Sequence, residues 1–473
     1  MKVNKLSIFL MLTIASLIIV GCSNDEDNND NGKVTLELWN NNDAGKTYYP
    51  KLIEKFESEN PEIEVDLKNL SPDTVDAEMQ SAISDDNLPD LFNQESFMID
   101  ELVDLDLVHE LDDIFPEEER EEYAEGIFND GNASLNGHVY MFPKYKGGTY
   151  MMYYNKEVME EYNISEIPET WEEIKKVGKQ IYKDSEGSTY GLLIGTQSDW
   201  LLNDVTKIMA TELAPESTMD YENGVYNYAN NGHAETLNFF KDLLDDDILS
   251  PTSLEVINEE ALEYFAVGES AFLIDGNWTG QLLSETDFEE FGVTKLPTKN
   301  PDGEHYDPLE IDSNDGLYVA KSTEHLEEAK IFLEFLQDNL YEEMLKLGTA
   351  VTAKDPENYD IEFPFDQLQD ISDIFNETAT TVPNAVVRNP EASEVETELK
   401  KNVPDTTVAS LFEDNLGGQI DDVEKELQKY DEEYNEAFTE AIENNENVDR
   451  EDFKFSNWVP YEPYTDEDYD ELE

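Results

Sequence analysis

After residue 32 the chain alternates between two hydrophobic periods, and this alternation constrains the fold more than any other feature. Residues 33–39 read K-V-T-L-E-L-W, in which apolar and polar residues alternate as in a half-buried strand. An amphipathic helical pattern follows at 48–59, an alternating strand at 63–67, a second helical pattern at 74–84 and a short buried strand at 89–92. Strands and helices that alternate at this spacing are typical of parallel βαβ units, which bind ligands outside the carboxyl ends of their strands.

The rest of the chain continues the mixture of strands and helices, without an internal repeat or a long Pro/Gly/Ser linker. Residues 137–156 predict extended chain, in which Gly147 and Gly148 are a candidate hinge. Thr170 and Glu173 form a capping box at the start of a helix. Further helices are predicted at 260–266, 326–340 and 420–444, and further strands at 191–194, 270–275 and 316–320. A chain of 473 residues is too long for one core, so we expect two lobes joined by short crossings.

Residues 1–21 predict a lipoprotein signal peptide. Lys2 and Lys5 precede an apolar run at 6–20, which is shorter than the roughly 20 residues that cross a membrane as a helix. The run ends in I-V-G-C, which resembles a bacterial lipobox, whose cysteine accepts a diacylglycerol. Cys22 is the only cysteine, so no intrachain disulfide is possible. Lipid on Cys22 would anchor the protein to the extracellular face of the cell membrane; an ordinary secretory signal that contains a cysteine is the alternative.

Residues 22–32 predict a disordered acidic tether, because C-S-N-D-E-D-N-N-D-N-G offers almost nothing to bury. Its aspartate and asparagine spacing matches the first half of an EF-hand loop. Leu38, however, stands where that loop requires a bidentate glutamate. A linker is therefore the better interpretation.

The charge of the chain excludes several kinds of partner. The sequence has 112 acidic and 30 basic residues, a formal net charge of −82. Such a surface repels nucleic acid and anionic lipid headgroups. An aromatic content of 11% and regular apolar periodicity argue against a disordered polyanion. Since salt near 1 M screens charges within about 3 Å, we expect a halophilic protein that is exposed to brine.

The motifs of common enzyme classes are incomplete, so we expect no catalytic residue, metal or cofactor. Residues 126–131 have P-loop glycine spacing, but Asn132 replaces the essential lysine. The sequence has no G-x-S-x-G and no H-E-x-x-H, and its five histidines are scattered singly. The 112 acids make carboxylate pairs uninformative about a glycosidase.

A series of segments resembles the family 1 extracellular solute-binding proteins, the group that includes the maltose-binding proteins. It begins with the strand that ends at Trp39. The later segments are N-L-P-D at 87–90, G-H-V-Y-M-F-P at 137–143, Y-N-K at 154–156, P-E-T-W-E-E-I at 168–174, F-A-V-G-E-S-A-F at 265–272, D-G-N-W at 275–278, F-G-V-T-K-L-P at 291–297 and G-L-Y-V-A at 316–320. Each is weak alone, and their order and spacing behind a lipobox carry the match.

The resemblance implies an α/β fold of the periplasmic-binding-protein type II class, in which two three-layer α/β/α lobes are joined by hinge crossings. We expect lobe 1 at 33–146 plus 314–345 and lobe 2 at 147–313 plus 346–473. The family captures a solute between its lobes, and the resemblance implies a sugar or oligosaccharide here. It also implies a monomer that delivers this solute to the permease subunits of an ABC importer.

Two departures from some sugar binders weaken an assignment to maltose in particular. Residues 92–97 read F-N-Q-E-S-F and contain no tryptophan, and K-Y-K-G-G at 144–148 contains no acidic group. Two other functions remain open. One is a secreted polysaccharide-degrading enzyme, and the other is a binding protein for ferric iron or another non-sugar solute, since 24 tyrosines can supply phenolate ligands.

A sugar has an apolar C–H face and a rim of hydroxyls, so its site needs flat aromatic rings and planar polar groups. Trp278, which follows a strand and a Gly-Asn turn, is the main stacking candidate. Trp200 is expected on a loop after the strand at 191–194, whereas Trp171 follows a helix cap and is predicted to be structural. The predicted ligand-binding residues are Trp278, Gln94, Glu95, Asn41, Asp43, Trp200, Trp39, Lys146 and Tyr150.

Overall fold

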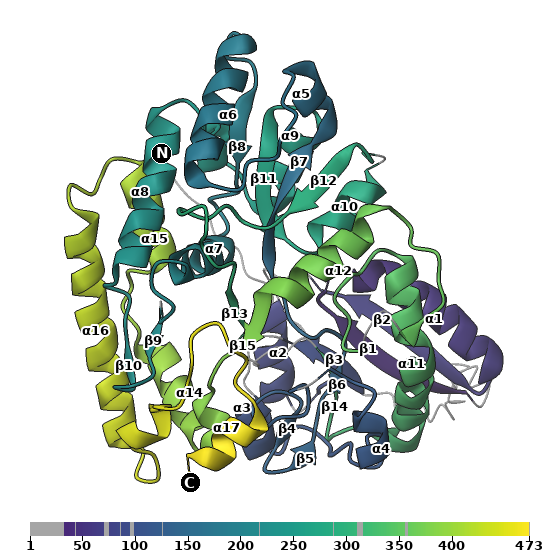
Figure 1. Ribbon diagram of the computed structural model, residues 1–473. Coiled ribbons are helices and arrows are strands. Elements are labelled where there is room, and N and C mark those ends of the chain that lie inside the picture. Colours follow the sequence, from purple (N-terminus) through teal and green to yellow (C-terminus); the bar gives the residue numbers. More distant parts are fainter. Residues whose placement is uncertain are drawn as a thin grey trace, which may run out of the picture.

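The computed structural model describes residues 33–42, 44–70, 75–85, 87–94, 99–124, 126–216, 218–286, 288–309, 316–354 and 358–472. The predicted signal peptide, the tether and Cys22 lie outside the described residues. Within these ranges no helix is long and apolar enough to cross a membrane. Figure 1 shows two sheet-centred lobes, with a layer of helices along one side of the molecule.

A mixed five-stranded sheet forms the centre of the first lobe, in the order β2-β1-β3-β14-β6. β1 runs parallel to β2 and β3, whereas β14 runs antiparallel to β3 and β6. Helices α1 and α2 connect the first three strands, which confirms the two predicted βαβ units. The elements are β1 Val34–Asn40, α1 Gly45–Glu59, β2 Ile63–Asn69, α2 Val75–Ser84, β3 Leu91–Gln94, β6 Phe142–Pro143 and β14 Gly316–Val319.

Helix α1 shows how the sequence pattern becomes packing in this lobe. Its buried face carries Tyr48, Leu52 and Phe56, which are four residues apart and therefore lie along one side of the helix. The ring of Phe56 meets Phe332 and Phe335 of α11 (Leu326–Lys346) at centroid distances of 4.9 and 5.3 Å. The predicted helix at 326–340 is confirmed and extends to Lys346.

A four-stranded sheet forms the centre of the second lobe, in the order β12-β7-β11-β8. β11 is parallel to β8 and antiparallel to β7, and every residue of β11 is buried. The predicted capping box at the start of α6 is confirmed, because Glu173 N–H donates to Thr170 Oγ1 and Glu173 Oε2 accepts from Thr170 N–H. The elements around this sheet are β7 Tyr150–Asn155, α5 Lys156–Glu161, α6 Trp171–Asp184, β8 Tyr190–Leu193, α9 Asn258–Ala266, β11 Ser270–Gly276, α10 Thr279–Glu285, β12 Phe291–Thr294 and α12 Gln367–Thr378.

The helical layer beside the second sheet combines the middle of the chain with its end (Figure 1). Its core includes Leu202 and Phe240 together with Phe412 and Leu427. A smaller apolar cluster joins α13 and α14 to α16 and a terminal 3-10 helix. The elements are α7 Asp199–Thr211, β9 Met219–Asp220, β10 Val225–Tyr226, α8 Asn231–Asp245, α13 Ala385–Arg388, α14 Ala392–Asn402, α15 Val408–Leu416, α16 Val423–Asn444, the 3-10 helix Arg450–Phe453 and α17 Asp466–Glu471.

The chain passes between the two sheets more than once. Residues 144–149 join β6 to β7, and the segment after α11 leads back to α12. At Gly147 the backbone has φ +138°, where a side chain is strained, and a Cβ would lie 2.6 Å from Leu309 Cδ1. The remaining short elements are α3 Ile99–Asp104, α4 Glu117–Arg120, β4 Ser134–Leu135, β5 His138–Val139, the 3-10 helix Pro251–Leu254, β13 Asp307–Leu309 and β15 Ala379–Thr381.

Candidate functional site

Trp278 lies immediately beyond the carboxyl end of β11, at the start of α10. A Cβ on Gly276 would fall 2.1 Å from the indole, so only glycine lets the ring fold back over the turn. Asn277 N–H donates to Thr149 O, and Asn277 Oδ1 accepts from Thr149 N–H, both at 3.0 Å. The turn that carries the indole is therefore fastened to the segment that leads into β7.

Three predicted residues from distant parts of the sequence meet at this turn. The indole of Trp278 lies 5.6 Å from that of Trp200 and 5.7 Å from the ring of Tyr150, centroid to centroid. Trp200 is 44% exposed and presents aromatic surface to solvent. We call these three residues the Trp278 cluster.

The prediction that Trp200 lies on a loop is wrong, because Trp200 sits in the first turn of α7. The helix begins directly after Ser198, and its buried residues Leu201, Leu202 and Val205 follow a helical period. The error came from extending the loop that follows β8 too far along the chain.

Tyr150 connects the Trp278 cluster to a carboxylate that the sequence analysis missed. Its hydroxyl donates to Asp204 Oδ2 at 2.6 Å. Burial, reinforced by the charge of Asp204, raises the pKa of Tyr150 well above its usual value, so the phenol stays protonated. Asp204 is four residues after Trp200 on α7, a spacing that would have indicated it once the helix was recognised.

Asp275 is a second carboxyl group that the sequence analysis missed. It is fully enclosed at the end of β11, and its Oδ1 accepts from Gly276 N–H at 2.8 Å. Burial raises the pKa of Asp275 to about 7, although hydrogen bonds from Gly276 and Thr279 oppose the rise. A titratable group therefore lies beneath the turn that carries Trp278.

The predicted residues of the first lobe make contacts of their own, separate from the Trp278 cluster. Trp39 is 7% exposed, with Lys68 Nζ 4.1 Å above its ring and its Nε1–H donating to Glu37 Oε1 at 2.8 Å. Asn41 is buried, and its Oδ1 accepts from Asn93 Nδ2–H. Gln94 ends β3, while Asp43 and Glu95 lie outside the described residues.

Lys146 lies in residues 144–149, the first crossing between the two sheets, and its side chain contacts α12. Its Nζ donates to Asn376 Oδ1 at 3.0 Å and stands 5.1 Å from the ring centroid of Phe375. In the same crossing the Tyr145 hydroxyl donates to Asn42 Oδ1 at 3.3 Å. The crossing thus contacts both lobes.

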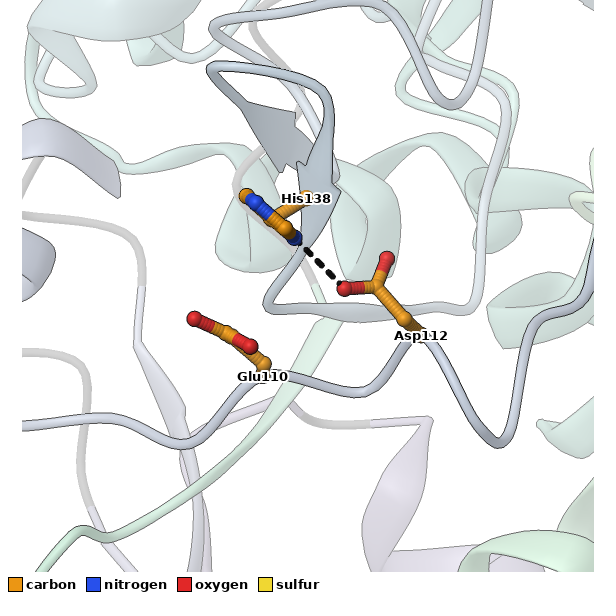
Figure 2. Close-up of side chains that lie close together, drawn as sticks. All are labelled: Glu110, Asp112 and His138. Atoms are coloured by element: carbon orange, nitrogen blue, oxygen red, sulfur yellow. Dashed lines mark hydrogen bonds and ion pairs between the residues drawn. The ribbon is translucent and has the colours of Figure 1, made fainter.

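The five histidines are scattered singly along the sequence, but the structure places His138 beside Asp112 and Glu110 (Figure 2). His138 Nδ1 and Asp112 Oδ2 are 2.7 Å apart, and Asp112 Oδ1 accepts from Arg120 at 3.0 Å and from Val139 N–H at 3.1 Å. The hydrogen bond to Asp112 raises the pKa of His138. Imidazole and carboxylate groups at this spacing are donors that zinc accepts. Because Asp112 is already engaged on both oxygens, we interpret the group as an ion-pair network that joins a loop to hairpin β4–β5.

Known proteins resemble this chain in both sequence and structure. The family model described as "Bacterial extracellular solute-binding protein" matches residues 39–341. The arabinooligosaccharide-binding protein of Bacillus subtilis strain 168 is 23% identical over 376 residues, 76% of this chain and 82% of that protein. The melibiose/raffinose/stachyose-binding protein of the same organism is 22% identical over 350 residues, 70% of this chain and 77% of that protein.

Two solved structures show the same fold at low sequence identity. The maltose/maltodextrin-binding domain from Bdellovibrio bacteriovorus bound to maltotriose matches with a TM-score of 0.65 and 19% identity, over 87% of this chain and all of that one (100%). An ABC substrate-binding protein from Listeria monocytogenes in complex with cycloalternan matches with a TM-score of 0.63 and 16% identity, over 86% of this chain and 99% of that one. The two-lobed α/β fold expected from the sequence is confirmed.

Proposed function

Because the chain belongs to the family of bacterial extracellular solute-binding proteins, we propose that it captures a sugar or oligosaccharide between its two lobes and delivers it unaltered to the permease of an ABC importer. The observation that carries this proposal is the Trp278 cluster. Trp200 and Trp278 supply aromatic faces, and Asp204 supplies a carboxylate one hydrogen bond away through Tyr150. Aromatic faces bordered by polar groups suit a sugar, which is apolar on its ring faces and polar at its rim.

The comparisons favour a sugar over other solutes. The named relatives bind arabinooligosaccharides and melibiose, raffinose or stachyose, and the two structural neighbours hold maltotriose and cycloalternan. Tyr150 is the one tyrosine of the Trp278 cluster, and its hydroxyl donates to Asp204 Oδ2 at 2.6 Å. The cluster therefore offers aromatic faces for a sugar rather than a set of phenolate ligands for ferric iron. An enzyme that degrades polysaccharides is the remaining rival, and the named relatives are binding proteins.

The lobes in this proposal are residues 33–146 plus 314–345 and residues 147–313 plus 346–473, with the hinge in the crossings between them. The apolar cluster around the first sheet supports this division, because it runs from Leu36 to Phe142 and resumes at Leu317. Among the described residues, the one buried member of this cluster beyond the proposed boundary at 345 is Ala353. Asn41, Gln94 and Lys146 would contribute polar contacts from the first lobe and the crossing.

The location of the protein in this proposal rests on its first residues. Lipid on Cys22 anchors it to the extracellular face of the cell membrane, and residues 22–32 act as the tether. The protein works as a monomer in brine, where salt screens the strongly negative charge that its 112 acidic residues give it. The name of the family agrees with an extracellular location.

A thermal-shift screen of mono- and oligosaccharides in molar salt tests the function. A bound ligand at 100 times its dissociation constant adds about 2.7 kcal/mol to the free energy of unfolding. Trp278→Leu should lose this response, whereas Trp39→Phe should keep it. Release of shorter sugars on incubation, or the absence of stabilisation by every sugar in the screen, would contradict the proposal.

A further inference from the structure

A cavity of about 470 Å³ lies among α7, α14, α16 and hairpin β9–β10. This volume is within the range of small-molecule sites. Aromatic side chains from widely separated segments line it, including Tyr221, Tyr226, Tyr228 and Tyr434. None of these four tyrosines belongs to the Trp278 cluster.

Helix α7 joins this cavity to the Trp278 cluster. Trp200, Asp204 and Lys207 are spaced at i, i+4 and i+7, so they lie along one side of the helix. Trp200 contacts Trp278, while Asp204 and Lys207 line the cavity. Seven residues of helix rise about 10 Å, so the helix carries a continuous row of ligand-type side chains from the cluster into the cavity.

The lining of the cavity matches the chemistry of a neutral sugar. Tyr226 and Tyr228 stack with their ring planes 4° apart, and Tyr434 packs edge-on against Tyr226 at 4.6 Å. Tyr226, Tyr228 and Tyr434 are each only partly buried, so this packed group of rings supplies aromatic and hydroxyl surface to the cavity.

The charges that line the cavity are balanced, in contrast to the chain as a whole. Lys207 and Lys400 stand with Asp204 and Glu396, whereas the sequence carries 112 acidic and 30 basic residues. A cavity with equal numbers of acidic and basic side chains favours an uncharged ligand over an anion or a cation.

We propose that this tyrosine-lined cavity is an extended subsite for the distal units of a neutral oligosaccharide whose first sugar stacks at Trp278. The inference rests on the proposed function and narrows it: the preferred ligand is an oligosaccharide, and affinity grows with the number of its units. Each added sugar gains an aromatic face and desolvates a further part of the cavity.

Calorimetric titration in molar salt with linear arabino- and malto-oligosaccharides, from the monosaccharide to the pentasaccharide, tests the subsite. In the wild type, affinity for the preferred series should rise by about tenfold or more from the disaccharide to the tetrasaccharide, or about 1.4 kcal/mol. Val403→Trp should abolish this gain and leave disaccharide affinity unchanged, because Val403 lines the cavity and is 36% exposed. Lys207→Gln should give a smaller loss for the longer sugars.

The matched control is Val267→Trp. Val267 and Val403 each follow the last turn of a helix, and Val267 is 81% exposed, away from the residues that line the cavity. This variant should bind every sugar as the wild type does. Equal affinity for short and long sugars, or full retention of the gain in both Val403→Trp and Lys207→Gln, overturns the subsite while leaving the proposed function intact. Absence of binding by any sugar in the wild type overturns the proposed function itself.

Discussion

Trp39 and Trp278 sit near the carboxyl ends of central strands in the two lobes, yet the structure gives them opposite surroundings. Trp39 is inside β1, where Lys68 covers its ring and Glu37 takes its N–H. Trp278 is beyond the end of β11, on a turn whose glycine lets the indole meet Trp200 and Tyr150. A tryptophan within a strand is committed to packing, whereas one in the following turn can be offered to a ligand.

The largest expected effect separates the two tryptophans by stability. Trp39→Ala should lower the free energy of unfolding by about 3–5 kcal/mol, because it leaves a cavity against the first sheet. The surviving folded protein should bind sugar with nearly wild-type affinity. Urea unfolding and calorimetry in molar salt measure the two quantities. If Trp39→Ala instead lost sugar affinity and kept its free energy of unfolding, Trp39 would be a ligand-binding residue, and the contrast with Trp278 would be wrong.

Trp278→Leu should show the reverse pattern. Affinity for the preferred sugar should fall by about a hundredfold, or roughly 2.7 kcal/mol, because the main stacking face is removed. The loss of stability should be smaller than in Trp39→Ala, since Trp278 is only partly buried. The same calorimetric titration measures it, and unchanged affinity would contradict the role given to Trp278.

The strand ends also differ in charge, and this gives a pH-dependent prediction. β1 ends on the neutral Asn40, which Asn41 follows, whereas β11 carries Asp275, whose pKa burial raises to about 7. The folded state therefore holds this proton more tightly than the unfolded state, in which the pKa is about 3.8. As the pH rises from about 4 to 7, the free energy of unfolding of the wild type falls. In this range the Asp275 carboxyl group is ionised in the unfolded state but still protonated in the folded state.

Asp275→Asn removes this ionisation while keeping an acceptor for Gly276 N–H. The variant should match the wild type near pH 4 and exceed it by roughly 2–4 kcal/mol above about pH 8. Unfolding curves across this pH range in molar salt measure the free energy of unfolding of both proteins. Taking the difference between variant and wild type cancels the contribution of the other carboxylates. A difference that does not vary with pH would show that Asp275 is not held in its neutral form.

The smallest expected effect belongs to the first lobe. The hydrogen bond to Asp112 raises the pKa of His138 above 6.5, so the ion pair stabilises the fold below that pH and is lost as pH rises through the raised pKa. His138→Gln should be slightly less stable than the wild type near pH 6 and equal to it near pH 9. Sugar affinity should not change at either pH. A change in affinity would connect this network to the Trp278 cluster.

Much of the fold could be predicted from the sequence because its signals are local. The alternating residues of β1 and β2 and the buried face of α1 each appear within one short window. The position of Trp278 could be predicted for the same reason, since the strand and the glycine turn that precede it are adjacent in sequence.

Features that depend on distant segments were not predicted. The tyrosine-lined cavity brings Tyr226 against Tyr434, two residues whose separation leaves no periodic pattern. Asp204 was missed because its role depends on a hydrogen bond from Tyr150 in another strand. His138 meets Asp112 only through the return of hairpin β4–β5 toward the preceding loop. Such pairings are set by tertiary packing rather than by spacing along the chain.

A crystal structure of the protein with its preferred oligosaccharide, grown in molar salt, tests the central claim most directly. It should show one sugar ring stacked on Trp278 between the two lobes, with its bonds intact and further units running along α7. A sugar bound elsewhere, cleaved, or held without contact to Trp278 would contradict the account.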